Sequence, residues 1–304
     1  MTIHCSTRAL HRAALALAAV LLIFFSVPPI HGQEPVVVTG MATPESVVHD
    51  PEADIYLVSN INGGPGDVDD NGFISRISPD GTITHLKWID GEDPAVTLHA
   101  PKGSAIYGDR FYVADIDTVR SFDRTTGAPL DAWAVPGATF LNDLAVGADG
   151  TVYVTDTGIS FGPDGITPTG TAALYRFDAE GQPHAIAQGN ELMLPNGVVE
   201  APQGLVLAPI GSNAVMIVGE DGSLTTLAEL PQGQLDGVVV AADGSLLVSS
   251  IGANAVYRID PAGAVSEVIS DTPAADIGID VERSRVLIPQ LNDHQLVIYP
   301  VSLD

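Results

Sequence analysis

Six polar residues recur at nearly regular spacing along the chain and are the residues best placed to do chemistry. The intervals between them are 57, 40, 54, 40 and 40 residues. Each begins a short segment with the pattern of a buried strand, and the six are Glu45, Lys102, Asn142, Asn196, Asp236 and Asp276. Two carboxylates and two amides of this set, on Glu45, Asp236, Asn142 and Asn196, offer only oxygen ligands, which hard divalent cations prefer. If folding gathers them, the set predicts a site for one divalent cation.

Calcium is the cation that this oxygen set favours most. Magnesium, manganese and zinc stay open as alternatives, although the absence of histidine from the six positions weighs against a dedicated zinc site. A water-filled polar channel without an ion is the other interpretation. Because clustered carboxylates without a cation would repel one another and raise their own pKa values, we favour a bound cation.

The segments around these residues predict the elements that must position them. Residues 235–268 read as four short strands separated by tight turns. A repeat of about 40 residues with four strands is typical of one blade of a β-propeller. Six copies predict an all-β, six-bladed β-propeller, with the six polar residues at one mouth of a central channel. The last copy lacks a fourth strand, so we expect residues 34–38 to supply it and close the ring.

Two insertions, residues 60–72 and 159–172, interrupt the repeat after the second strands of blades one and three. The second strand of a blade ends where the first begins, so both loops are expected over the mouth that carries the polar residues. There they would flank Lys102 and indicate a pocket.

Lys102 stands where the other blades carry carboxylates or amides. Its ammonium could bind a substrate oxygen, or it could neutralise Glu45 or a neighbouring acid, and both interpretations stay open. His99 lies three residues earlier and is expected near the same mouth, as a substrate contact or as an ordinary polar surface residue.

The N-terminal residues predict a secretory signal peptide. Basic side chains precede the apolar run 13–27, and cleavage is expected near Gly32. The predicted organisation is therefore a signal peptide at 1–32 and one propeller domain at 33–304, in a protein that is secreted or periplasmic and has no membrane contact after cleavage. An uncleaved membrane anchor is the alternative, although the run is short for a full span.

Charge and cysteine content exclude several classes of function. The formal net charge is −26 with only two lysines, which argues against nucleic-acid and anionic-membrane partners. The one cysteine, Cys5, precedes the apolar run, so the mature chain would contain neither a disulfide nor a thiolate nucleophile or ligand. The expected partner is a small-molecule substrate, and the sequence leaves the oligomeric state open.

Four segments give the chain a family resemblance: TPESVVHDP, FLNDLAV, LPNGVV and LDGVVV. Over residues 36–304 it resembles the senescence marker protein, gluconolactonase and luciferin-regenerating group of six-bladed propellers. It is more distantly similar to diisopropyl fluorophosphatases, paraoxonases and strictosidine synthase-like proteins. The resemblance implies a metal held by Glu45, Asn196 and Asp236, with Asn142 on the open coordination side as a ligand or substrate contact.

The function implied by the resemblance is metal-dependent hydrolysis of a small lactone or ester, in which the cation polarises the carbonyl. Asp236 is the expected general base, and Asn142, Lys102 and His99 are the expected substrate contacts. The alternative is a non-enzymatic propeller that binds a ligand or protein around a structural ion. The arginine that precedes the Asn motif in some sugar lactonases has no counterpart in ATFLND, so the substrate stays open.

Overall fold

The computed structural model describes residue 1 and residues 34–163 and 165–302. Gln33–Asp304 form one compact unit, whose described residues are treated below. Apart from Met1, the predicted signal peptide lies outside the described residues. Within the described part of the chain, we find no helix with the length and hydropathy needed to cross a membrane.

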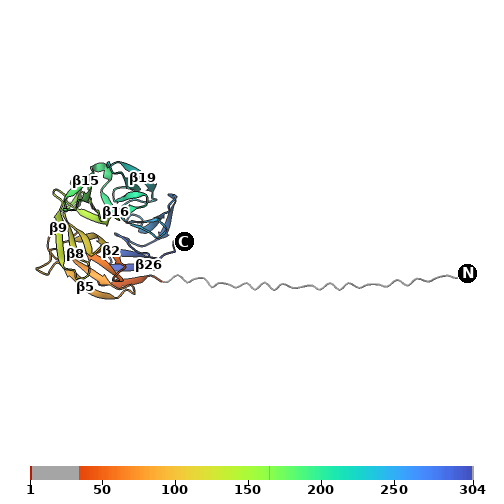
Figure 1. The fold of residues 1–304 in the computed structure, drawn as a ribbon, viewed down its shortest axis with the longest axis horizontal. Helices are drawn as coiled ribbons and strands as arrows, with labels where there is room; N and C mark the ends of the chain where they lie inside the picture. Colours follow the sequence, from red (N-terminus) through yellow and green to blue (C-terminus); the bar gives the residue numbers. More distant parts are fainter. Residues whose placement is uncertain (2–33, 164, 303–304) are drawn as a thin grey trace. The chain divides into compact units, whose positions relative to one another are not determined.

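Six four-stranded sheets stand around a central axis, which confirms the predicted all-β, six-bladed propeller (Figure 1). The first three sheets are β2 (Pro44–Asp50), β3 (Ile55–Asn60), β4 (Phe73–Ile77) and β5 (Ile83–Asp90); β6 (Pro101–Tyr107), β7 (Arg110–Asp115), β8 (Thr118–Asp123) and β9 (Pro129–Ala134); and β10 (Leu141–Val146), β11 (Val152–Asp156), β14 (Ala173–Phe177) and β15 (Pro183–Gln188). The next two are β16 (Pro195–Ala201), β17 (Gly204–Pro209), β18 (Ala214–Val218) and β19 (Leu224–Glu229); and β20 (Leu235–Val240), β21 (Leu246–Ser250), β22 (Ala255–Ile259) and β23 (Val265–Ile269).

The sixth sheet takes three strands from the end of the domain and one from its beginning. It consists of β24 (Gly278–Asp280), β25 (Arg285–Gln290), β26 (Gln295–Pro300) and β1 (Val36–Thr39). Strand β1 overlaps the segment 34–38 that the sequence predicts for this place, and it pairs antiparallel with β26. Across the neighbouring seam, the Tyr56 hydroxyl in the first sheet donates a hydrogen bond to Asp280 Oδ2 in the sixth at 2.7 Å.

The core is divided among the interfaces between neighbouring sheets. Six clusters of buried apolar side chains fill these interfaces, one for each pair of adjacent sheets. The strands near the axis are buried on both faces, as in β3 and β21, whereas the outer strand β9 is mostly exposed. This explains why the inner strands are almost continuous apolar runs in the sequence. The polar residues that interrupt them are buried as well.

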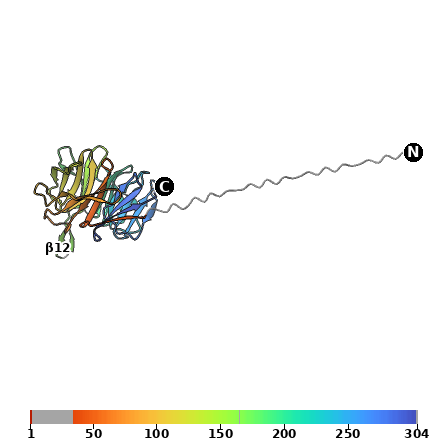
Figure 2. The ribbon, with the colours of Figure 1, turned by 90° about the horizontal axis from the view of Figure 1, so that it is seen from below.

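Two small elements lie outside the six sheets. The hairpin of β12 (Ile159–Gly162) and β13 (Gly165–Pro168) belongs to the second insertion, and it projects from one face of the ring (Figure 2). A single turn of 3-10 helix, η1 (Asn190–Leu192), precedes the inner strand of the fourth sheet.

Candidate functional site

The structure brings the six predicted polar residues to one end of the central channel and buries all of them. In five sheets the polar residue is the second residue of the inner strand. Each of the six residues is at most 7% exposed. Asp276 lies just before β24, where its amide donates a hydrogen bond to Glu45 O at 3.1 Å. Asn196 Nδ2 donates to Asp236 Oδ1 at 2.8 Å. Residues from distant parts of the sequence therefore share one buried space.

The strand register shifts at the polar residue in these five inner strands, and hydroxyl groups satisfy part of the backbone that the shift leaves unpaired. Thr155 Oγ1 in β11 accepts a hydrogen bond from Asp143 N at 3.0 Å and donates to Asn196 O, in the next blade, at 2.8 Å. Ser249 Oγ in β21 accepts from Gly237 N at 2.9 Å and donates to Ala275 O at 2.8 Å. These hydroxyls tie each polar residue's strand to its neighbour.

Glycine directly after Asn196 and Asp236 lets adjacent inner strands approach closely. A Cβ atom on Gly197 would lie 2.1 Å from Asp236 O, and one on Gly237 would lie 2.3 Å from Asp276 Oδ1. No side chain fits at such distances, so the glycine of each motif positions the polar residue of the following blade. The Asn-Gly and Asp-Gly pairs are thus explained by packing across blades.

We expect Gly237→Ala to lower the free energy of unfolding by about 3 kcal/mol, at the upper end of overpacking effects, because its Cβ would meet backbone as well as a carboxyl group. Urea denaturation measures this change. Gly162→Ala is the matched control, since nothing lies within 4 Å of its Cβ position. Equal effects of the two substitutions would contradict the close-approach explanation.

Burial and mutual repulsion disfavour ionisation of the carboxyl groups in this space. Burial, followed by the charges of Asp236 and Asp276, raises the pKa of Glu45 well above its usual range. Burial and then the charge of Asp276 raise the pKa of Asp236 to about 8, although the hydrogen bond from Asn196 lowers it. Burial raises the pKa of Asp276 to about 6, against hydrogen bonds with Ser46 and Asp143. A positive charge in their midst would offset the repulsion.

Two oxygen atoms of the site are buried without a hydrogen-bond partner among the described residues: Glu45 Oε2 and Asn196 Oδ1. Leaving a buried polar atom unpaired costs about 1–3 kcal/mol, so such atoms usually mark a ligand or ion. In the described chain, no three His, Cys, Asp or Glu side chains are arranged to hold a metal. A cation here would therefore need amide oxygens beside the carboxylates, which is the donor set that Glu45, Asn196 and Asp236 provide.

Lys102 is 1% exposed and forms a defined set of contacts. Its Nζ donates a hydrogen bond to Ala100 O at 2.9 Å and lies 4.3 Å from the ring centroid of Phe140. Burial lowers the pKa of Lys102 to about 8, while the carboxylates of Glu45 and Asp115 oppose the shift. The charges of Glu45 and Asp115 thus favour the ammonium form of Lys102.

Asn142 is oriented by a residue that the sequence analysis does not single out. Asn142 Nδ2 donates to Thr157 Oγ1 at 3.0 Å, and Thr157 Oγ1 donates to Pro195 O at 2.8 Å. Because this contact engages the amide nitrogen, the amide oxygen of Asn142 is left for the site. Thr157 directly follows the second strand of its blade, and no repeat pattern distinguishes it in the sequence.

The two insertions meet at this end of the channel. The ring of Phe161 from the β12–β13 hairpin lies against Gly66 of the first insertion, and its centroid is 5.2 Å from that of Phe140, which covers Lys102. His99 is held by the first insertion, because its Nδ1 accepts a hydrogen bond from Asp70 N at 3.1 Å. The cavity in the channel is lined by residues of the inner strands, and a pocket beneath the two insertions stays a prediction.

Asp143 is a buried carboxyl group with no role predicted from the sequence. It is 6% exposed, and its two oxygens accept hydrogen bonds from Leu144 N at 2.6 Å and Val198 N at 2.7 Å. Burial and then the charge of Asp276 raise its pKa well above the usual range. The sequence could have indicated Asp143, because it directly follows the polar residue of its blade, where two other blades carry Gly197 and Gly237.

Comparison with protein families gives one extended match. The model of the SMP-30/gluconolactonase/LRE-like region matches residues 44–277, which contain all six polar residues. A search of curated proteins finds no match.

Solved structures resemble this chain at low sequence identity. A gluconolactonase from Xanthomonas campestris is 22% identical with a TM-score of 0.65, and the alignment covers 89% of this chain and 91% of that one. A calcium-binding protein, regucalcin, from Agrobacterium tumefaciens is 17% identical with a TM-score of 0.60, covering 86% and 91%. A luciferin-regenerating enzyme is 16% identical with a TM-score of 0.62, covering 88% and 95%. At these identities the likenesses establish the fold alone.

Proposed function

Because the chain belongs to the SMP-30/gluconolactonase/LRE-like family, we propose that it is a metal-dependent hydrolase of small lactones or esters. The observation that carries the proposal is the pair of unpartnered buried oxygens, Glu45 Oε2 and Asn196 Oδ1, among carboxyl groups with raised pKa values. The descriptions of a gluconolactonase and of a calcium-binding protein among the similar structures support a lactone substrate and a divalent cation, with calcium favoured. We extend the proposal to a secreted or periplasmic location, on the N-terminal sequence alone.

Glu45, Asn196 and Asp236 are the proposed ligands of the cation, with Asn142 as a fourth ligand or a substrate contact. When bound, the cation supplies the positive charge that polarises a substrate carbonyl. Asp236 is the proposed general base. Its Oδ1 accepts a hydrogen bond from Asn196 Nδ2, which fixes the carboxyl and leaves Oδ2 to take a proton from water.

Lys102 and Asn142 are the proposed positioning groups for the substrate. Lys102 is anchored by Ala100 O and by the Phe140 ring, and Asn142 by Thr157, so both side chains are held in place before a ligand arrives. His99 is also a proposed substrate contact, and Asp70 of the first insertion holds its imidazole ring.

A panel of lactones and aryl esters, assayed on the purified protein with and without a chelator, tests this function. We expect turnover of at least one substrate class, its loss with the chelator and its recovery when calcium is restored. If no substrate is hydrolysed while calcium still raises the melting temperature, the protein is instead a binding propeller with a structural ion.

A further inference from the structure

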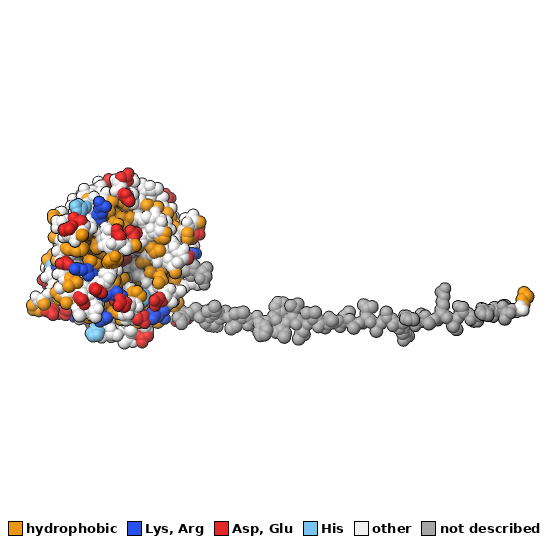
Figure 3. Space-filling view, viewed as in Figure 1, with side chains coloured by type: hydrophobic (Ala, Val, Ile, Leu, Met, Phe, Trp, Pro, Cys, Tyr) orange, Lys and Arg blue, Asp and Glu red, His pale blue; other side chains and the backbone are white. Residues whose placement is uncertain are grey.

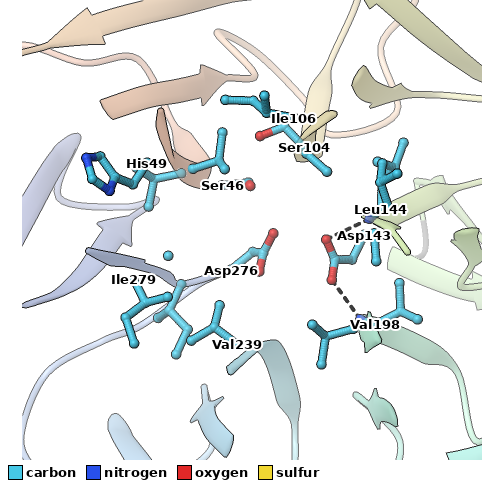
Figure 4. Close-up of a pocket in the computed structure, with 18 of the residues that line it drawn as sticks. Ser46, His49, Ser104, Ile106, Asp143, Leu144, Val198, Val239, Asp276 and Ile279 are labelled. Atoms are coloured by element: carbon cyan, nitrogen blue, oxygen red, sulfur yellow. Dashed lines mark hydrogen bonds between the residues drawn. The ribbon is translucent and has the colours of Figure 1, made fainter. Parts of the chain in front are cut away.

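A second space with the properties of a ligand site lies in the central channel. It is a cavity of about 470 Å³, within the usual size range for small-molecule sites. Ser46, Asp143 and Asp276 line its inner end, and residues farther along the inner strands line the rest (Figure 4). The cavity and the proposed metal site are therefore neighbours in one channel, since a Cβ atom on Gly237, which follows Asp236, would lie 2.3 Å from Asp276 Oδ1.

The wall of the cavity is mostly aliphatic, with His49, Tyr107 and Arg124 among the other lining residues. Hydrophobic side chains surround the centre of the ring in the space-filling view (Figure 3). All six inner strands contribute to this wall, with Ile106, Leu144, Val198, Val239 and Ile279 among the side chains drawn in Figure 4. Such a wall gains about 25 cal/mol for each Å² of apolar ligand surface that it takes from water. It therefore suits an alkyl or similar apolar body.

The inner end of the cavity is polar and rich in hydrogen-bond acceptors. The carboxyl groups of Asp143 and Asp276 face one another there, and the hydroxyls of Ser46 and Ser104 point toward the same space (Figure 4). Both aspartates are 6% exposed. Ser104 Oγ is buried and has no hydrogen-bond partner among the described residues. A ligand that reaches this end must bring hydrogen-bond donors.

The charges around the cavity select against an anion. Among the described lining residues, Arg124 is the only lysine or arginine, and it pairs with Asp50 and Glu52. Its guanidinium is thus already engaged by carboxylates. The inner end otherwise presents carboxyl and hydroxyl oxygens, so an ammonium group, whose charge favours an ionised carboxylate beside it, is complementary to this end.

We propose that this cavity is a second binding site, for a small alkylamine. The ammonium group donates hydrogen bonds to Asp276 and Ser104, and the alkyl chain lies along the aliphatic wall toward the open end. An ammonium has three donors and no acceptor, which matches the acceptors at the inner end. The site uses no residue that we assign to hydrolysis, and its inner end borders the proposed metal site through Asp276.

Calorimetric titration of the purified full chain with hexylammonium chloride, in calcium-containing buffer, tests the site. We expect saturable binding of one equivalent. Hexanoate, with the same chain and the opposite charge, is expected to show no saturable binding. Hexanol is expected to bind at least about tenfold more weakly, because it brings one neutral donor where the ammonium brings three charged donors. Binding of hexanoate as tight as that of hexylammonium, or no saturable binding of hexylammonium, would overturn the proposal.

Two variants locate the ligand. Asp276→Asn removes the facing charge and Val239→Phe fills the cavity from its wall, and each is expected to weaken hexylammonium binding by about tenfold or more. Asp293→Asn, an exposed carboxyl outside the cavity, is the matched control and should bind as the unmodified chain does. Circular dichroism checks that each variant is folded. If Asp276→Asn does not fold, Val239→Phe decides, and unchanged binding in the folded variants refutes the location.

Discussion

Replacement of Asp236 by Asn is expected to reduce lactone or ester hydrolysis by about 10²–10⁴-fold, the usual contribution of a general base. Asn has nearly the same shape, so the contact with Asn196 can be kept while the proton acceptor and the negative charge are lost. The buried carboxyl at this position resists ionisation, with a pKa raised to about 8, so a neutral amide should leave the metal-free fold at least as stable. Steady-state kinetics and a thermal melt on the same preparation measure both quantities.

Asp293→Asn serves as the control for this variant, since it removes an exposed carboxyl with no assigned role. It should keep the activity of the unmodified protein. Asp236→Asn with nearly full activity would refute the assignment of Asp236 as base and ligand. Loss of activity together with unfolding would instead indicate a structural role, which the thermal melt distinguishes.

Calcium is expected to raise the melting temperature by about 10 °C when its concentration is about a thousandfold above its dissociation constant. Binding at that excess stabilises the folded state by about 4 kcal/mol, and each kcal/mol shifts the melting temperature of a domain of this size by about 2–4 °C. Scanning calorimetry with calcium and with a chelator measures the difference.

The same experiment has a defined pH dependence. The pKa values of Asp276 and Asp236 are raised to about 6 and about 8, above those of the unfolded chain, so the folded metal-free protein retains protons that the unfolded chain releases. Their contribution to stability is fully present below about pH 4 and is lost as the pH rises through 6 and 8. We therefore expect the metal-free protein to melt at a lower temperature at pH 9 than at pH 6, and calcium to stabilise it more at pH 9.

The net charge of −26 also disfavours the compact state at high pH, so a matched variant is needed. Asp236→Asn keeps nearly all of that charge and removes one of the titrating carboxyls. Its melting temperature should depend less on pH and respond less to calcium. A metal-free protein that is more stable at pH 9 than at pH 6 would contradict the carboxyl cluster as the source of the effect.

The sequence predicts the propeller well because each blade repeats the same local signals. A polar residue, an apolar strand and a tight turn recur about every 40 residues, so the positions of Glu45, Asn196 and Asp236 at the starts of inner strands follow from counting. Strand β1 is predictable for a related reason, since the last copy lacks a strand that the beginning of the domain can supply.

Contacts between blades are less predictable, because each depends on two segments that are far apart in the sequence. The orienting role of Thr157 depends on Pro195 in the next blade, and the burial of Asp143 depends on Val198. The two roles considered for Lys102 could be weighed only after the structure placed Phe140 over its ammonium group. The channel cavity is lined by side chains from all six inner strands, so no single segment of the sequence predicts it.

Strand β1 beside β26 places the beginning and the end of the domain next to each other. Val36 pairs with Ile298, so the two ends meet at the same edge of one sheet. During synthesis the ribosome must therefore release almost the whole domain before this pair can form. A circularly permuted gene that joins residue 302 to residue 36 through a short linker would turn the pair into an ordinary hairpin, so that the sixth sheet could assemble from a continuous stretch of chain.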